Sequence, residues 1–476
     1  MTPDGDAVLD LPRSSPEAHG VPSEALARLL RRWEDSGLEP HAVVVLRDGH
    51  VVAEASWAPY DCDRPGLVYS VSKTVTACAV GFAVAEGRLD LQDRLVDLFP
   101  EAASVAGPRA AALTLHDVLA MRTGHREDTL VHRGRGVTTF PQTFLAREPE
   151  DEVGSFVYHN GATLLAALAV QRATGERLTD YLRPRLFEPV GITGTSWQSS
   201  EGLDIGFSGL HVSTESVARL GELVRCDGLW RGRRVLPEGW VQQMTAVHTD
   251  TSAHPESADW QQGYGYQMWR CRHDAVRADG AFGQFSVVVP DARLVLALTS
   301  CTDRTQGTLD AVWEELLPAL SDEPLPPDPD AAARLAEWLA TRSLPVRASS
   351  AEPTGDGPWR SEHTPVPDHP RLTAVTVRRG TPGDAADWVL TVDDDGIVEV
   401  PCGDGSWAGA RQTPYAATGG WSAPDTFEAT VAAVETPHAL SVRLHAGTVS
   451  ARWNGVPLGP PVLGLLHAPD ADGRTR

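Results

Sequence analysis

The sequence contains almost no lysine: of its 41 lysine and arginine residues, 40 are arginine and only Lys73 is lysine. Acidic residues outnumber basic ones: 64 aspartates and glutamates against 41 lysines and arginines give a net charge of −23. Nucleic acids and anionic membranes are polyanions, so neither attracts such a chain electrostatically. We therefore expect no nucleic-acid partner and no membrane partner.

Long apolar runs are also missing. No stretch approaches the length that spans a membrane, and the first twenty residues lack the basic and apolar segments of a signal peptide. The six cysteines form no C-x-x-C pair and have no regular spacing, which is typical of free thiols in a reducing compartment. Together these absences predict a cytoplasmic protein.

The length of 476 residues exceeds what one hydrophobic core usually covers, and 42% hydrophobic residues with 14 tryptophans indicate packed structure. An acidic, proline-rich stretch, "SDEPLPPDPD", marks a boundary after residue 320. We predict a domain over 1–320, a linker with a short helix over 321–350, and a smaller domain over 351–476. Alternating runs such as "LTAVTVRR" and "ALSVRLHAG" predict that the last domain is a β-barrel or sandwich.

The first domain combines strands at its two ends with helices between them. A hairpin is expected over 41–56, with its turn at Asp48-Gly49, and two more strands over 282–300, with a turn at Pro290-Asp291. Helical patterns cover 70–87, 114–121, 161–175 and 214–228, and the second and fourth begin at threonines that suit an N-cap, Thr114 and Thr214. This order predicts an α+β fold with a mainly antiparallel sheet.

Ser70 and Lys73 stand three residues apart at the start of the helix predicted over 70–87, so they share one of its faces. A serine hydroxyl is a poor nucleophile until a neighbour takes its proton. A buried lysine can take that proton because burial lowers its pKa, whereas arginine stays protonated. A need for one deprotonatable amine explains why this chain keeps one lysine. S-x-x-K alone also occurs at protein surfaces without a catalytic role.

A second motif, Tyr158-x-Asn160, comes just before the helix predicted over 161–175. A phenol beside a serine–lysine pair can relay a proton to a leaving group, and an asparagine amide can hold the nucleophile region and a substrate carbonyl. Alternatively, the two side chains only cap the helix, since Y-x-N alone says little.

S-x-x-K at the head of a helix, followed by Y-x-N about ninety residues later, resembles the penicillin-recognising serine hydrolases. Segments such as "GRLDLQDRLVDLFPE", "LTLHDVLAMRTGH" and "GLHVSTESVARLGELV" extend this resemblance over most of 12–320, within the class C β-lactamase branch and its DD-peptidases, esterases and aminohexanoate-dimer-hydrolase-like amidases. The resemblance implies an antiparallel sheet flanked by helices, a helical lobe, and the serine between them.

The resemblance also implies roles for individual residues. Ser70 would be the acylated nucleophile, Lys73 the general base, Tyr158 a proton relay and Asn160 a positioning donor and acceptor. No cofactor is implied, and no histidine belongs to an H-E-x-x-H pattern, so we expect no metal.

The third motif of this family, K-T-G or H-x-G, has its best match at 278–281, "ADGA". Gly280 fits, and the backbone N–H of Ala281 together with that of Ser70 would form an oxyanion hole. The cation is missing, and strand alternation would aim the neighbouring Arg277 differently. Gln284 is either a substrate contact or a structural residue of the turn.

The missing cation favours small esters, amides or peptides as substrates over β-lactams, because that cation helps to hold a substrate carboxylate. The leading hypothesis is therefore a serine hydrolase that works through an acyl-enzyme. One alternative is an acyltransferase or peptide cyclase that uses the same site, since the sequence does not separate water from an amine as acceptor. Another is a catalytically silent binding protein on this fold. The sequence leaves the oligomeric state open.

Overall fold

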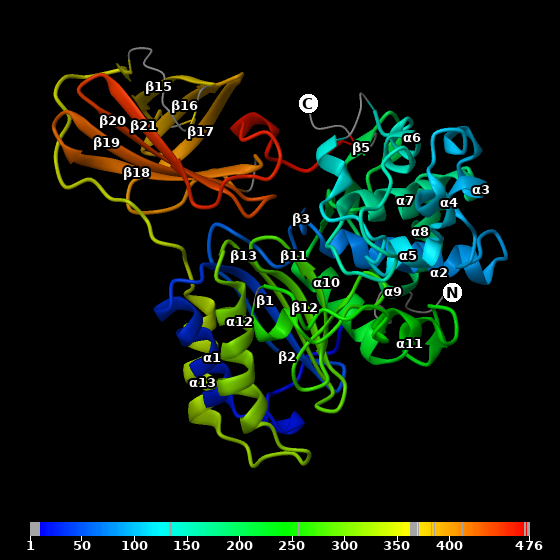
Figure 1. Cartoon of the computed structure of the whole chain (residues 1–476). Coiled ribbons are helices and arrows are strands. Elements are labelled where there is room, and N and C mark those ends of the chain that lie inside the picture. The colour runs from blue at the N-terminus through cyan, green and yellow to red at the C-terminus, as the bar shows by residue number, and fades with distance from the viewer. Residues whose placement is uncertain are drawn as a thin grey trace, which may run out of the picture.

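The computed structural model of the chain describes residues 10–132, 136–255, 257–361, 369, 371–381, 383–384, 386–410, 413–470 and 473. These residues form two parts with separate hydrophobic cores (Figure 1). The larger core is built from residues up to Leu335, and the smaller one lies within a curled β-sheet that begins at Trp359. The boundaries at 320 and 351 stay predictions.

The larger part is organised around a six-stranded sheet in which every pair of neighbours is antiparallel. Across the sheet the strands are β10 (Trp269–Arg270), β11 (Val276–Gly280), β12 (Gln284–Val289), β13 (Leu294–Ser300), β1 (Pro40–Arg47) and β2 (His50–Ser56). The β1–β2 and β12–β13 hairpins lie where the sequence predicts them. Asp48 and Gly49 both have positive φ, 52° and 76°, as the predicted tight turn requires.

Helices cover both faces of this sheet, and β1 is accordingly buried along its whole length. On one face lie α1 (Ser23–Asp35), α12 (Thr305–Ala311) and α13 (Pro329–Ala340), which pack together (Figure 1). On the other face, α10 (Thr214–Arg225) packs on β1, β12 and β13. The helix of the predicted linker, α13, thus belongs to the wall of the larger part.

A helical lobe stands beside the sheet (Figure 1). Its helices are α2 (Val71–Ala85), α3 (Leu95–Leu98), α4 (Pro108–Ala112), α5 (Leu115–Leu119), α6 (Phe140–Leu145), α7 (Asn160–Thr174), α8 (Leu178–Leu182), α9 (Glu188–Val190) and α11 (Trp240–Thr245). Short strands lie among these helices. One sheet has three strands, β3 (Gly66–Leu67), β7 (Leu210–Val212) and β4 (Ser196–Trp197), and two pairs are β5 (Ser199–Ser200) with β6 (Leu203–Asp204) and β8 (Leu229–Trp230) with β9 (Arg233–Arg234).

Of the two N-cap residues predicted from the sequence, one is correct. Thr114 caps α5 in a capping box with Asp117. Helix α10, however, is capped by Ser213 and not by Thr214: the Ser213 hydroxyl oxygen accepts the backbone N–H of Ser216. Serine and threonine are both good N-caps, so two adjacent ones leave the choice to the tertiary structure.

The smaller part is a single curled sheet of eight strands (Figure 1). In order these are β14 (Trp359–Arg360), β15 (Leu372–Arg379), β16 (Trp388–Asp394), β17 (Ile397–Gly403), β18 (Tyr415–Ala423), β19 (Thr426–Ala433), β20 (Ala439–His445) and β21 (Thr448–Trp453). Its core includes Trp388, Trp421 and Trp453. This sheet and the larger part together confirm the predicted α+β fold with a C-terminal all-β domain.

The β domain contacts the larger part close to the start of α2. The backbone N–H of Leu67 in β3 donates to the carbonyl of Glu435 at 2.9 Å. Tyr60 packs into a small cluster with Ala416, Val434 and Ala439 of the β domain. The loop before α2 is therefore held between the two parts.

None of the helices in the described part of the chain is long and apolar enough to cross a membrane. All six cysteines lie among the described residues, and each is a free thiol.

Gly81 lets helix α2 approach α11 closely. A Cβ built at Gly81 would overlap the buried indole ring of Trp240, whose Nε1–H donates to the carbonyl of Ala77. Glycine to alanine within a helix ordinarily stabilises by about 0.5–1 kcal/mol. We predict that Gly81→Ala instead destabilises by about 1–3 kcal/mol, because the methyl group overpacks this contact.

Chemical denaturation measures this effect, and Gly307→Ala in α12 is the matched control. A Cβ at Gly307 meets only one atom, Leu38 Cδ2 at 3.9 Å, so this variant should show the ordinary stabilisation. A stabilised Gly81→Ala protein would contradict the close packing of α2 on Trp240.

Candidate active site

Ser70 lies where the chain passes from strand β3 into helix α2. After β3, the chain turns through Tyr69, whose φ is 46°, and Ser70 occupies the N-cap position of the helix. Ser72 fixes this turn, because its hydroxyl donates to the carbonyl of Tyr69 at 2.5 Å and accepts the N–H of Leu210 at 3.1 Å. Ser70 remains half-buried at the positive end of a 15-residue helix.

Lys73 lies one helical turn further along α2 and is almost completely buried, with 1% of its surface exposed. Its Nζ is within hydrogen-bond distance of three oxygens: Asn160 Oδ1 at 2.6 Å, Ser70 Oγ at 2.8 Å and the carbonyl of Phe207 at 2.9 Å. The structure thus brings Lys73 together with two of the residues predicted from the sequence. Phe207 was not predicted, because a backbone carbonyl leaves no signal in residue identity.

The pKa of Lys73 is lowered to about 7 by burial. Two carboxylates, those of Asp128 and Asp279, raise this pKa and oppose the effect of burial only in part. A large fraction of the Lys73 side chains is therefore neutral at physiological pH, and a neutral amine can accept a proton.

Tyr158 lies next to Ser70 and Lys73. Burial raises the pKa of Tyr158 well above its ordinary value, and a hydrogen bond with Ser70 opposes this shift. The Nζ of Lys73 is 4.8 Å from the centre of the Tyr158 ring, and the ring stacks on Trp269 at 5.8 Å. The phenol is therefore protonated and can donate to a group bound at Ser70.

Asn160, the first residue of α7, connects Lys73 to a carboxylate that the sequence did not single out. Its Oδ1 accepts from Lys73, and its Nδ2 donates to Asp128 Oδ2 at 2.8 Å. The other oxygen of Asp128 accepts the N–H groups of Leu130 and Gly161 at 3.0 Å each. No local signal in the sequence indicates Asp128, whose carboxylate fixes the orientation of the Asn160 amide. These contacts support a positioning role for Asn160.

Gly280 ends strand β11 directly against the segment before Ser70. A Cβ at this position would overlap the carbonyl oxygen of Val68, so only glycine allows the strand to approach. The next residue, Ala281, is partly exposed. This contact brings the 280–281 segment to the start of α2, as an oxyanion hole between Ala281 and Ser70 requires.

The structure holds no exposed cation on β11. Ala278, at the position of the family's lysine, is 1% exposed, and Arg277 is completely buried. The Arg277 guanidinium donates to Asp279 Oδ2 at 2.8 Å and to the carbonyl of Asp259 at 2.7 Å. It also lies over the ring of Trp260. Arg277 therefore cannot reach a substrate carboxylate.

Gln284 is 2% exposed, and its side chain faces the protein. Its Nε2 donates to the carbonyls of Ser300, Ala281 and Phe282 at 2.7, 3.2 and 3.3 Å. Of the two roles that the sequence leaves open, these contacts favour the structural one: Gln284 shapes the loop that carries Ala281.

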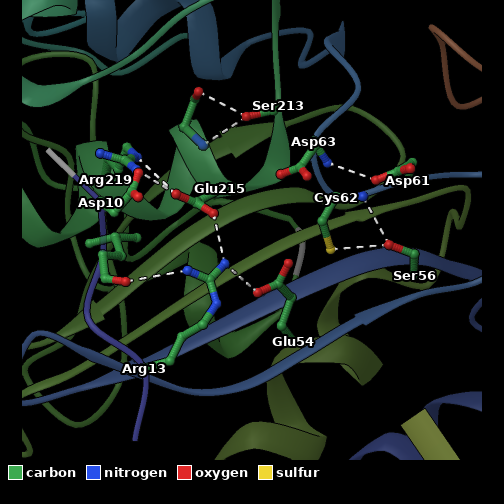
Figure 2. A network of polar contacts seen from close by, with 12 residues as sticks. Asp10, Arg13, Glu54, Ser56, Asp61, Cys62, Asp63, Ser213, Glu215 and Arg219 are labelled. Carbon is green, nitrogen blue, oxygen red and sulfur yellow. Dashed lines mark hydrogen bonds and ion pairs between the residues drawn. The ribbon is translucent and has the colours of Figure 1, made fainter. Parts of the chain in front are cut away.

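One group of three carboxylates comes together elsewhere, in Glu54, Asp63 and Glu215, with ligand atoms within 4.8 Å of one another. Figure 2 shows that Arg13 reaches between them: its Nη2 lies 2.8 Å from Glu54 and 3.1 Å from Glu215. Arg219 binds Glu215 as well, at 2.5 Å. Arg13 and Arg219 thus pair with Glu54 and Glu215, and the group includes none of the predicted site residues.

A family match to known proteins covers the part of the chain that carries these site residues. The family model described as β-lactamase matches residues 30–320. The 6-aminohexanoate-dimer hydrolase of Paenarthrobacter ureafaciens is 29% identical over 257 residues, which are 48% of this chain and 63% of that protein. Penicillin-binding protein 4 of Amycolatopsis lactamdurans is 26% identical over 352 residues, 65% of this chain and 88% of that protein. The match thus spans less than two thirds of the first relative.

The chain belongs to the β-lactamase family. Solved structures share its fold: EstCE1, a hydrolase with promiscuous acyltransferase activity, has a TM-score of 0.53 at 15% identity and covers 61% of this chain and 99% of its own. A penicillin-binding protein homologue from Caulobacter crescentus has a TM-score of 0.50 at 17% identity, and the alignment covers 64% of this chain and 99% of that chain. The resemblance to this family of serine hydrolases is confirmed.

Because Lys73 is the only lysine, its pKa is open to direct measurement: protein grown with ¹³Cε-lysine should give a single lysine signal. We predict that this signal titrates near pH 7. In Asp279→Asn the midpoint should move to lower pH, because one of the two carboxylates that stabilise the ammonium form is lost.

Asp291→Asn in the exposed turn between β12 and β13 makes the same change of net charge and should leave the midpoint unchanged. A midpoint near that of free lysine would show that the amine is solvated and charged.

Proposed function

We propose that this chain is a serine hydrolase that forms an acyl-enzyme at Ser70 and acts on small esters, amides or peptides. The observation that carries the proposal is the set of three oxygens around Lys73 Nζ. A neutral amine has two N–H donors and one lone pair. The amide oxygen of Asn160 and the carbonyl of Phe207 have no proton to give, so they accept the two N–H groups. The lone pair is then left for the hydroxyl proton of Ser70.

In the acylation step, Ser70 Oγ attacks the substrate carbonyl carbon while its proton moves to Lys73 Nζ. The carbonyl oxygen becomes an oxyanion, which the N–H groups of Ser70 and Ala281 would bind. Such donors stabilise the transition state more than the ground state.

Tyr158 completes the step at the leaving group. Its phenol donates a proton to the departing alkoxide or amine nitrogen, and the ammonium of Lys73 returns a proton to the phenolate oxygen. As the bond from the carbonyl carbon to the leaving group breaks, the tetrahedral intermediate collapses to the acyl-enzyme, and both Lys73 and Tyr158 are neutral again. Water attacks the ester carbon and gives its proton to Lys73, which passes it to Ser70 Oγ as the acid leaves.

The surroundings of β11 support neutral substrates. Ala278 and the buried Arg277 offer no cation to a substrate carboxylate, and Asp279 adds negative charge near Lys73. A charge-assisted hydrogen bond contributes about 1.5–3 kcal/mol, so its absence weakens β-lactam binding. The curated relative named 6-aminohexanoate-dimer hydrolase supports amides as one substrate class.

A fluorophosphonate probe tests the proposal. We predict one label for each chain, on the peptide that contains Ser70, and complete loss of label and turnover in Ser70→Ala with an unchanged fold. Ser36→Ala at the exposed end of α1 is the control and should label like the wild type. Labelling of another serine in the intact protein would overturn the assignment.

The same preparation is tested side by side on p-nitrophenyl esters, aminoacyl amides and nitrocefin. The ester kcat/KM should exceed that of nitrocefin by at least about 10-fold, the worth of the missing charge-assisted contact. Comparable nitrocefin turnover would show that another group supplies the cation.

A further inference from the structure

A histidine of the β domain reaches the residue that precedes Ser70. His438, in the turn between β19 and β20, is completely buried. Its Nε2 lies 2.5 Å from Tyr69 Oη in the larger part, and its Nδ1 lies 2.8 Å from the carbonyl oxygen of Gly455. The imidazole thus joins the β domain to the start of the turn into α2.

The direction of both hydrogen bonds follows from the chemistry of the partners. Burial lowers the pKa of His438 to about 4, so the ring is neutral and carries one N–H. The carbonyl of Gly455 can only accept, which places that N–H on Nδ1. Nε2 is therefore the acceptor, and it receives the phenolic O–H of Tyr69. Burial raises the pKa of Tyr69, so the phenol keeps the proton that it donates.

Tyr69 and Phe282 flank the two N–H groups of the proposed oxyanion hole. Tyr69 comes directly before Ser70 and has φ 46°, and Phe282 comes directly after Ala281 and has φ 64°. Bulky aromatic residues such as tyrosine and phenylalanine rarely adopt this left-handed conformation unless the surrounding structure enforces it. Both halves of the hole thus depend on a neighbouring residue that needs external support.

The His438 ring supports both of these residues. Its centre lies 5.8 Å from that of Tyr69 and 4.9 Å from that of Phe282, each in an edge-to-face arrangement. The rings of Tyr69 and Phe282 are 5.4 Å apart. Gly455 closes the cluster, since a Cβ at this position would lie 2.9 Å from Phe282 Cε1. One side chain of the β domain therefore packs against both flanks of the hole.

We propose that His438 is a positioning residue that holds the N–H groups of Ser70 and Ala281 in register through Tyr69 and Phe282, so that the β domain completes the oxyanion hole. This role rests on the proposed function, since an oxyanion hole has a purpose only in acyl transfer. His438 touches no reacting atom and acts through its two neighbours.

Tyr69→Phe tests the role most cleanly, because it removes one oxygen and keeps the ring. We expect kcat for a p-nitrophenyl ester to fall about 10-fold, with KM within twofold, since a misplaced hole weakens only transition-state binding. In His438→Asn the shorter side-chain amide can still donate to the carbonyl of Gly455, as Nδ1 does, but it offers no acceptor at the position of Nε2. This variant should therefore behave like Tyr69→Phe. His438→Gln offers an acceptor near the position of Nε2 and should recover most of kcat.

The control is Arg64→Gln, which removes a different bond across the same interface, from Arg64 Nη1 to the carbonyl of Thr413 at 3.3 Å. It should leave kcat within twofold of the wild type. A wild-type kcat in Tyr69→Phe would overturn the proposal. An equal loss of kcat in His438→Gln and His438→Asn would also overturn it, and so would an equal loss of kcat in Arg64→Gln and Tyr69→Phe.

Amide hydrogen exchange on the full chain separates this proposal from the proposed function. Tyr69→Phe and His438→Asn should raise exchange in peptides covering 67–72 and 280–285 and leave β1 unchanged, whether or not the wild type turns over esters. Unchanged exchange in both peptides would show that His438 does not hold these segments, and would contradict the proposal even if Ser70 labels as expected.

Discussion

A primary amine held in the protein interior by neutral oxygens is the constraint on which the proposed active site depends. Among the described residues, the hydrogen-bond partners of Lys73 Nζ are a hydroxyl, a side-chain amide and a backbone carbonyl. Burial therefore favours the neutral form, and the carboxylates of Asp128 and Asp279 act on it without pairing directly. The balance leaves a lysine with a pKa of about 7, close to the value that suits a general base.

The fold supplies this environment from segments that are far apart in the sequence. Helix α2 carries Ser70 and Lys73, the start of α7 carries Asn160, and the loop before β7 provides the carbonyl of Phe207. Strand β11 closes against Val68 only because residue 280 is glycine. The turn before α2 also contacts the β domain, through the hydrogen bond between Tyr69 and His438. The site is thus a product of tertiary packing, although its two motifs are local.

The sequence predicts the parts of this arrangement that leave local signals. Turn chemistry at Asp48-Gly49, the N-cap at Thr114 and the helical pattern over 161–175 each define an element within a few residues. The spacing of Ser70 and Lys73 on one helical face follows from periodicity alone. The N-cap of α10 was misplaced by one residue, since Ser213 and Thr214 suit it equally on residue type.

Long-range contacts could not be predicted in the same way. Nothing near Asp128 shows that it orients Asn160, which lies 32 positions further along the chain. Nothing near His438 shows that it meets Tyr69, because 369 positions separate these two residues. Gln284 shows the same limit: its place after Gly283 fits both a substrate contact and a turn. Only its three carbonyl partners distinguish them.

The most direct test of the central claim is the single-turnover acylation rate of Lys73→Arg. If only a positive charge were needed at this position, arginine would serve, as it does at the 40 other basic positions of the chain. The account predicts a folded protein whose acylation by an ester or a fluorophosphonate is slower by about 10²–10⁴-fold, because arginine cannot take the proton of Ser70. A folded variant that acylates at nearly the wild-type rate would contradict it and leave Tyr158 as the base.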